Sequence, residues 1–184
     1  LISGDPSYAI LRAMATIATF GIEIPEHSGA GGILGEATLA VVMLFALSRS
    51  TFSTVFARAR KWRASEDPEL RVAAGLVLVA TLVVIGQGAH SVAGLGARLE
   101  LMWGAFFTSL SFLTTTGLTS DSLPSGILNF DPVEIILIAL AMIGGGVATT
   151  AGGIKLLRVF ILAGHSRAEV NRLIAPSQVI SGQL

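Results

Sequence analysis

Residues 104–124 read GAFFTSLSFLTTTGLTSDSLP, a short apolar stretch that ends in three threonines and a glycine. A cation that has lost its water shell needs oxygen ligands, and backbone carbonyls turned toward an axis can supply them. Gly117 can adopt backbone conformations that side chains forbid, and threonine hydroxyls can satisfy neighbouring backbone groups. The pattern predicts a cation filter made by Thr114, Thr115, Thr116, Gly117 and Leu118.

A second short stretch has the same order of features. Residues 8–29 read YAILRAMATIATFGIEIPEHSG, in which an apolar segment leads to Thr19, Phe20 and Gly21 and then to polar residues. A long apolar segment follows both stretches, and Gly21 and Gly117 are 96 positions apart (117 minus 21). The spacing predicts an internal repeat with a second filter at Thr19–Gly21. The alternative is coincidence in a sequence rich in alanine, threonine and glycine.

Composition indicates an all-α integral membrane protein. The 184 residues are 52% hydrophobic and 13% charged, with a mean hydropathy of +0.75, whereas soluble domains carry about 25% charged residues. A net charge of zero gives no indication of nucleic-acid binding, and the absence of cysteine excludes thiol chemistry. Because the chain starts with Leu1 and stops at SGQL, we expect a fragment of a longer protein.

Three segments are long and apolar enough to be predicted spans: residues 34–57, 70–89 and 133–163. Short loops rich in lysine and arginine face the cytoplasm. Such residues follow the first span and the third, which places both regions inside and residues 90–132 outside. These residues are Arg58, Arg60, Lys61, Arg63, Arg71, Arg167 and Arg172.

The opening stretch therefore lies in a loop whose two ends are on the same side of the membrane. The apolar segment 99–113 would reach about 22 Å as a helix, which is short of the ~30 Å hydrocarbon core. We expect a re-entrant pore helix followed by an extended return over residues 114–119. The alternative is a helix that lies on the outer surface.

A run of glycines interrupts the third span in AMIGGGVATTAGGIKLLR, residues 141–158. Each glycine weakens a helix by about 1 kcal/mol relative to alanine, which favours an unwound segment that gates a permeation path. The alternative is a tightly packed helix, since small residues favour close helix packing in membranes. The candidate gate residues are Gly144, Gly145, Gly146, Thr149, Thr150, Gly152, Gly153 and Lys155.

Several charged residues have two possible roles. Lys155 either extends its ammonium group to the membrane interface or places a positive charge near the ion path. Glu36 and Glu134 start helices on the outer side, where each is either a partner of the helix dipole or an ion ligand. The three histidines have no spacing that indicates a metal site; they are His27, His90 and His165.

Three strings resemble the Trk/Ktr/HKT superfamily of potassium transporters. SFLTTTGLTS (111–120) is similar to the third filter of the family, and MIGGGVATTAGGIKLLRVFIL (142–162) to the inner helix of the third repeat. AEVNRLIAPSQVI (168–180) is similar to the segment that follows, with Ala175 where histidine is common. In that family, four repeats of outer helix, pore helix, filter and inner helix surround one pore, as in potassium channels.

The resemblance implies a division of the chain. Residues 1–59 would end repeat two, 60–67 would form a cytoplasmic linker, 68–164 would form repeat three, and 165–184 would lead to repeat four. It also implies potassium or sodium as the ion, no organic cofactor, a homodimer, a cytosolic nucleotide-binding regulatory subunit and the bacterial inner membrane. The chain departs from the family pattern at Phe20, beside the second filter glycine, and at Ala148 and Ala151 in the gate.

The sequence thus favours a monovalent-cation transporter subunit and no enzyme, because no Ser/Lys, paired Asp or His/Glu arrangement is visible. Two other functions stay open. A secondary transporter of a small solute would need a partly polar pocket at the broken helix. A non-conducting membrane scaffold is the second alternative.

Overall fold

The structure, a computed structural model, describes residues 6–21, 32–47, 68–90, 92–124, 126–129, 131–145 and 152–174. Within these ranges every regular element is a helix. The elements in chain order are α1 (Pro6–Ile17), α2 (Gly32–Leu47), α4 (Pro68–Gly88), α5 (Leu95–Leu113), the 3₁₀ helix η3 (Ile127–Asn129), α6 (Asp131–Ile143) and α7 (Leu156–Ile174).

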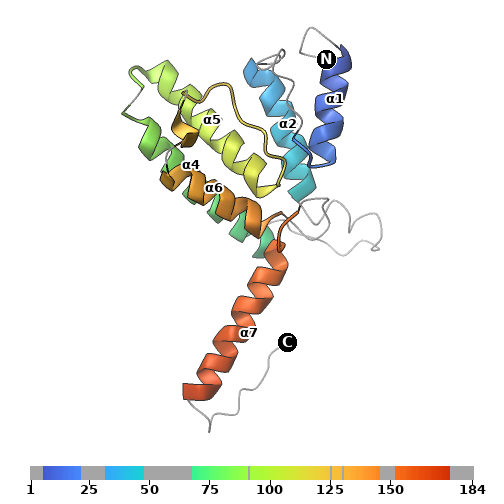
Figure 1. The fold of residues 1–184 in the computed structure, drawn as a ribbon, viewed down its shortest axis with the longest axis vertical. Helices are drawn as coiled ribbons and strands as arrows, with labels where there is room; N and C mark the ends of the chain where they lie inside the picture. The colour runs from blue at the N-terminus through green and yellow to red at the C-terminus, as the bar shows by residue number, and fades with distance from the viewer. Residues whose placement is uncertain are drawn as a thin grey trace.

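Helix α5 lies at the centre of the packed part of the molecule, between α2 on one side and α4 and α6 on the other (Figure 1). Phe107, Leu110 and Leu113 are buried on it. Helix α1 packs on α2, at the far side from α6. The helix that carries the threonine turn at its end is therefore the best-covered element in the described part of the chain.

One described segment, Arg71–Gly88 in α4, is by length and composition suited to cross a membrane. Gly32–Leu44 and Pro132–Ile143 are shorter apolar helices. The first predicted span, 34–57, is described only as far as Leu47, and residues 48–67, with Arg49 and most of the predicted basic loop, lie outside the described residues.

The third predicted span is divided, as the glycine run indicated. Helix α6 ends at Ile143 and α7 begins at Leu156. Helix α7 continues to Ile174, eleven residues beyond the predicted end of the span at 163, and projects away from the other helices (Figure 1). Its last part is exposed and carries an ion pair between Glu169 and Arg172 (3.5 Å), which contributes little stability because solvent screens it.

The chain reverses direction after α5 and runs back along it. The backbone N–H of Leu118 donates to the Ser111 hydroxyl (2.7 Å), and the N–H of Ser120 donates to the Thr108 hydroxyl (3.3 Å). Further along, Leu123 lies against Gly104. Residues further along the return thus contact residues nearer the start of α5, so the return runs antiparallel to the helix. Helix α5 itself begins four residues earlier than predicted, after Gly94, whose φ of 106° strongly favours glycine.

The close contact at Gly104 generates a prediction about stability. A Cβ there would lie 3.1 Å from Cγ of Leu123, and a larger side chain would push the return off the helix. We expect Gly104→Val to lower the free energy of unfolding of the full-length protein by about 1–3 kcal/mol, the usual cost of overpacking. Thermal unfolding in detergent measures the change.

Gly96→Val is the matched control, because Gly96 lies on the same helix with open space around its Cα. Its effect should stay within about 0.5 kcal/mol, as for exposed positions. Equal effects of the two substitutions would mean that the return does not pack on α5.

Candidate functional site: two facing turns and a helix break

A tight turn of main-chain hydrogen bonds ends α5. Thr115 and Gly117 have φ angles of 57° and 76°, in the left-handed region that glycine adopts readily and that threonine rarely adopts. Four N–H groups fold back onto the last turn of the helix. Three of the bonds are 3.0 Å or shorter: Thr114 N–H to Leu110 O (2.9 Å), Thr115 N–H to Phe112 O (3.0 Å) and Thr116 N–H to Ser111 O (2.9 Å). The Gly117 N–H also donates to Ser111 O, at 3.4 Å.

The end of α1 repeats this turn 96 residues earlier. Thr19 has a φ of 52°, at the position that corresponds to Thr115. Each donor and acceptor is displaced by the same 96 positions. The bonds are Ala18 N–H to Met14 O (2.9 Å), Thr19 N–H to Thr16 O (3.1 Å) and Phe20 N–H to Ala15 O (2.8 Å). The spacing that the sequence predicted is therefore present in the backbone geometry.

The two turns meet. A Cβ built on Gly21 would overlap the carbonyl oxygen of Thr116 and would lie 3.3 Å from the carbonyl carbon of Gly117. Gly21 must therefore be glycine for this approach. Phe20, beside it, has 66% of its surface exposed and does not separate the turns.

Threonine hydroxyls support the turn after α5, as the sequence predicted. The Thr114 hydroxyl lies 3.1 Å from each of the carbonyl oxygens of Leu110 and Ser111, and 3.0 Å from the Thr116 hydroxyl. Thr114 and Thr116 are buried, and so is the side chain of Leu118. The hydroxyls of Thr114 and Thr116 are therefore engaged with groups of the protein itself.

Glu36 has partners that sequence reasoning missed. Its carboxylate, 4% exposed, lies in the second turn of α2 and accepts hydrogen bonds from the return after α5. The Ser120 hydroxyl lies 2.8 Å from both carboxylate oxygens, and the Asp121 N–H and the Trp103 indole N–H donate at 3.2 and 2.8 Å. Only its place near a helix start was visible in the sequence. Glu134 is exposed within the described part of the chain.

The break between α6 and α7 is closed by hydrogen bonds across it. In a continuous helix the carbonyls of Met142 and Ile143 would accept from residues 146 and 147. Here they accept from the N–H groups of Ile154 (3.0 Å) and Lys155 (2.8 Å), which are eight positions further along. The helical ladder therefore resumes after a loop of eight inserted residues. Of the predicted gate residues, Gly146, Thr149 and Thr150 lie outside the described residues.

Glycines allow the two sides of this loop to touch. Gly144 and Gly153 have φ angles of 74° and 81°. A Cβ on Gly144 would overlap the carbonyl oxygen of Gly152, and one on Gly153 would lie 2.8 Å from the Met142 carbonyl oxygen. Gly145 is buried beside them. Lys155 also has a positive φ (72°). It directly precedes the N-terminus of α7, and a positive charge is least favourable at that end of a helix.

The break contacts the threonine turn directly. The backbone N–H of Gly152 donates a 2.8 Å hydrogen bond to the Thr115 hydroxyl. The structure therefore brings together three of the features that the sequence picked out separately: Thr19–Gly21, Thr114–Leu118 and the described part of the glycine run.

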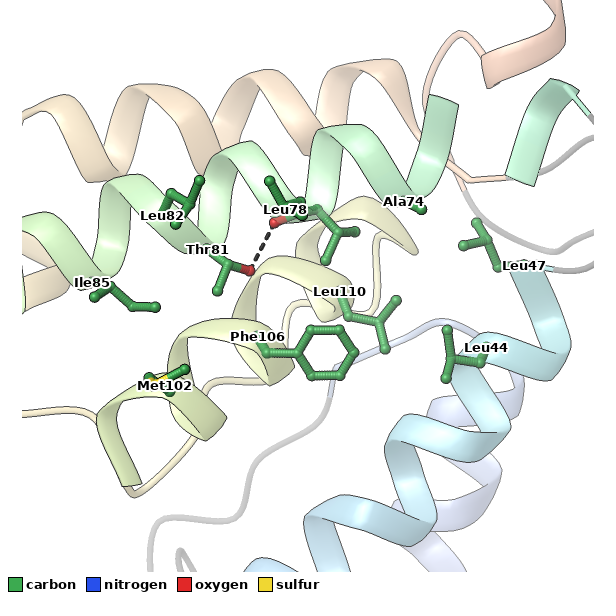
Figure 2. A pocket seen from close by; sticks show the side chains of 11 residues that line it. Leu44, Leu47, Ala74, Leu78, Thr81, Leu82, Ile85, Met102, Phe106 and Leu110 are labelled. Carbon is green, nitrogen blue, oxygen red and sulfur yellow. Dashed lines mark hydrogen bonds between the residues drawn. The ribbon is translucent and has the colours of Figure 1, made fainter. Parts of the chain in front are cut away.

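An apolar cavity of about 370 Å³ lies elsewhere, between α2, α4 and α5 (Figure 2). The polar side chain in its lining is Thr81, whose hydroxyl already bonds to the Val77 carbonyl (2.7 Å). No lining residue belongs to the helix break, so this cavity is not the partly polar pocket that a solute transporter would need there. Over the described ranges, no group of three or more metal-ligating side chains occurs, and His27 lies outside them.

Comparisons with known proteins place this arrangement in a family. No protein-family model matches the chain. The Trk system potassium uptake protein TrkH of Escherichia coli K12 is 34% identical over an alignment of 192 positions that covers 98% of this chain. TrkH of Salmonella typhimurium is 32% identical over 99% of this chain. The chain belongs to the Trk/Ktr/HKT superfamily. It spans 37–38% of the length of these two relatives.

A solved structure gives the same fold. The crystal structure of the potassium transporter TrkH from Vibrio parahaemolyticus superposes with a TM-score of 0.73 over 92% of this chain and 36% of that chain, at 24% sequence identity. The chain therefore has the all-α fold of that transporter, which confirms the predicted fold class. The relatives are named as transporters and not as enzymes, in agreement with the predicted absence of an enzymatic function.

The glycines at the break predict a stability difference between two similar substitutions. Gly144→Ala introduces a side chain at a positive φ and against the Gly152 carbonyl, so it should lower the free energy of unfolding of the full-length protein by about 1–3 kcal/mol. Gly86→Ala, in open space on α4, should raise it by up to ~1 kcal/mol because alanine favours helix. Thermal unfolding compares the two, and a Gly144→Ala protein as stable as the parent would contradict the described break.

Proposed function

We propose that the chain forms the end of one repeat and the whole of the next repeat of a potassium uptake protein, and that potassium ions cross the membrane between its two facing turns. Dehydrated ions would bind backbone carbonyls of Thr114–Leu118 and of Thr19–Gly21. The named relatives, which are potassium uptake proteins, support potassium as the first choice of ion over sodium. No organic cofactor is part of this proposal.

The contact between the two turns is the observation that carries the proposal. A single strand cannot surround an ion, whereas strands from several repeats arranged about an axis can. Here two turns with matching hydrogen bonds, from segments 96 residues apart, lie against each other at Gly21 and Thr116. In the proposed assembly, two further repeats complete the ring of carbonyls.

The glycine-rich segment would gate the path. It leaves the helix at Gly144, returns at Gly152 and bonds to the Thr115 hydroxyl. A loop attached to the filter in this way would obstruct the ion path on its cytoplasmic side and would open it by moving aside. Non-helical backbone at membrane depth needs a protein or water-filled surrounding, which a pore provides.

Sidedness, partners and driving force complete the proposal. The basic loop 58–71 and the segment after 164 would face the cytoplasm of a bacterium, and residues 90–132 would face outward. The protein would sit in the plasma membrane as a homodimer and associate with a cytosolic nucleotide-binding regulatory subunit. The membrane potential would drive uptake, since moving one charge through 100 mV is worth about 2.3 kcal/mol.

Gly117→Ser in the full-length protein tests the filter. The substitution places a side chain at a φ of 76° within the proposed ligand set, so the carbonyls beside it should turn away. We expect potassium uptake to fall by about tenfold or more, which a barrier change of about 1.4 kcal/mol produces. Initial rates of potassium uptake by cells depleted of potassium measure the change.

Gly126→Ser is the matched control, because Gly126 also has a positive φ (93°) and open space around it but lies outside the filter. It should retain uptake at equal amounts of protein in the membrane. Normal uptake and selectivity in Gly117→Ser would reject the filter and would favour a non-conducting scaffold.

Thr115→Val tests the gate. Valine has the shape of threonine and cannot accept the hydrogen bond from Gly152, so the loop should leave the filter more often. A neutral hydrogen bond contributes about 1 kcal/mol, which corresponds to a rise of about fivefold in the open population and in the uptake rate.

Thr115→Ser keeps the hydroxyl and should behave like the parent protein. Thr81→Val, which removes only a bond within α4, controls for the loss of a threonine hydroxyl in general. Uptake that is unchanged or reduced in Thr115→Val would show that this bond does not hold the path closed.

A further inference from the structure

The return after the threonine turn is attached to a different repeat by one buried carboxylate. Glu36 belongs to α2, which follows the first turn in the chain, whereas its donors belong to α5 and to the return after the second turn. The donors are 67 to 85 residues further along the sequence. Glu36 therefore connects the two turns by a route that is independent of the contact between Gly21 and Thr116.

The partners of Glu36 suit a group that accepts hydrogen bonds. Carboxylate oxygens accept strong hydrogen bonds from N–H and O–H donors. Within the described ranges, the groups that hydrogen-bond to it, the Trp103 indole, the Ser120 hydroxyl and the Asp121 amide, all donate toward it. A carboxamide of the same shape would direct an NH₂ group at one of these donors.

The attachment point is close to the proposed ion ligands. Ser120 is three residues beyond Gly117, and its N–H also bonds to Thr108 on the pore helix. The bonds from Thr108 and Ser111 fix the return to its own helix, and the bonds to Glu36 fix it to the neighbouring repeat. Loss of the bonds to Glu36 would leave the return attached to α5 but would weaken its attachment to the repeat that carries the first turn.

We propose that Glu36 is a positioning residue for ion selectivity. It holds the return at Ser120 and Asp121, and so it sets the distance between the carbonyls of the second turn and those of the first. The inference rests on the proposed function, because selectivity between ions presupposes a conducting filter. Glu36 binds no ion in this proposal, since its oxygens are occupied by protein donors.

Glu36→Gln in the full-length protein is the first test. We expect the ratio of potassium to sodium uptake to fall by about tenfold, the effect of losing a hydrogen bond to a charged group. Uptake of each ion is measured with the other as competitor, at equal amounts of protein in the membrane. Glu100→Gln, an identical change at an exposed position on α5, should leave the ratio unchanged.

Ser120→Ala tests the same bond from the other side and disturbs folding less, because it removes a single oxygen. It should lower the selectivity ratio as Glu36→Gln does, while Ser122→Ala, two residues on, should not. The double variant of Glu36→Gln and Ser120→Ala should be no worse than the more affected single variant, because both changes remove one shared interaction.

The outcomes separate this inference from the proposed function. If Gly117→Ser loses selective uptake while Ser120→Ala and Glu36→Gln keep it, the positioning role is wrong and the filter stands. If Gly117→Ser also keeps selective uptake, both are wrong. If Glu36→Gln does not accumulate in the membrane, the comparison of Ser120→Ala with Ser122→Ala decides: equal selectivity in these two variants overturns the positioning role.

Discussion

The approach of Gly21 to the carbonyl oxygen of Thr116 is the constraint on which the rest of the structure depends. No side chain fits at that point, and the turns that end α1 and α5 meet there. Helix α2, which follows the first turn, packs on α5, and there Glu36 accepts a hydrogen bond from the return. This contact between two backbone segments sets how closely the two turns approach each other.

The helix break obeys a second constraint, which is that backbone groups in a membrane must be satisfied within the protein. An inserted loop normally leaves the last carbonyls of a helix without partners. Here the N–H groups of Ile154 and Lys155 take the places of those of residues 146 and 147. The chain can therefore leave the helix between Gly144 and Gly152 without exposing the carbonyls of Met142 and Ile143.

Much of this arrangement could be predicted from the sequence, because it is encoded locally. The apolar composition indicated a helical membrane protein, the T-x-G strings gave the spacing of 96, and the glycine run marked the broken span. The partners of Glu36 could not be predicted, since they depend on how α2 packs against α5, over 67 to 85 residues of sequence. For the same reason the sequence did not indicate that Thr115 bonds to Gly152, or which N–H groups close the break.

The three hydrogen bonds that recur after 96 residues join main-chain atoms alone. These main-chain bonds do not depend on the side chains, so the two copies can differ: alanine, threonine and phenylalanine at 18–20 against three threonines at 114–116. The hydroxyls of Thr114 and Thr116 add further bonds to the second turn. Copies of a duplicated segment can in this way diverge in chemistry while their architecture persists. Each copy is then able to acquire its own attachments to the surrounding protein. In the proposed pore of four similar repeats, the properties of one repeat can therefore change without a change in the others.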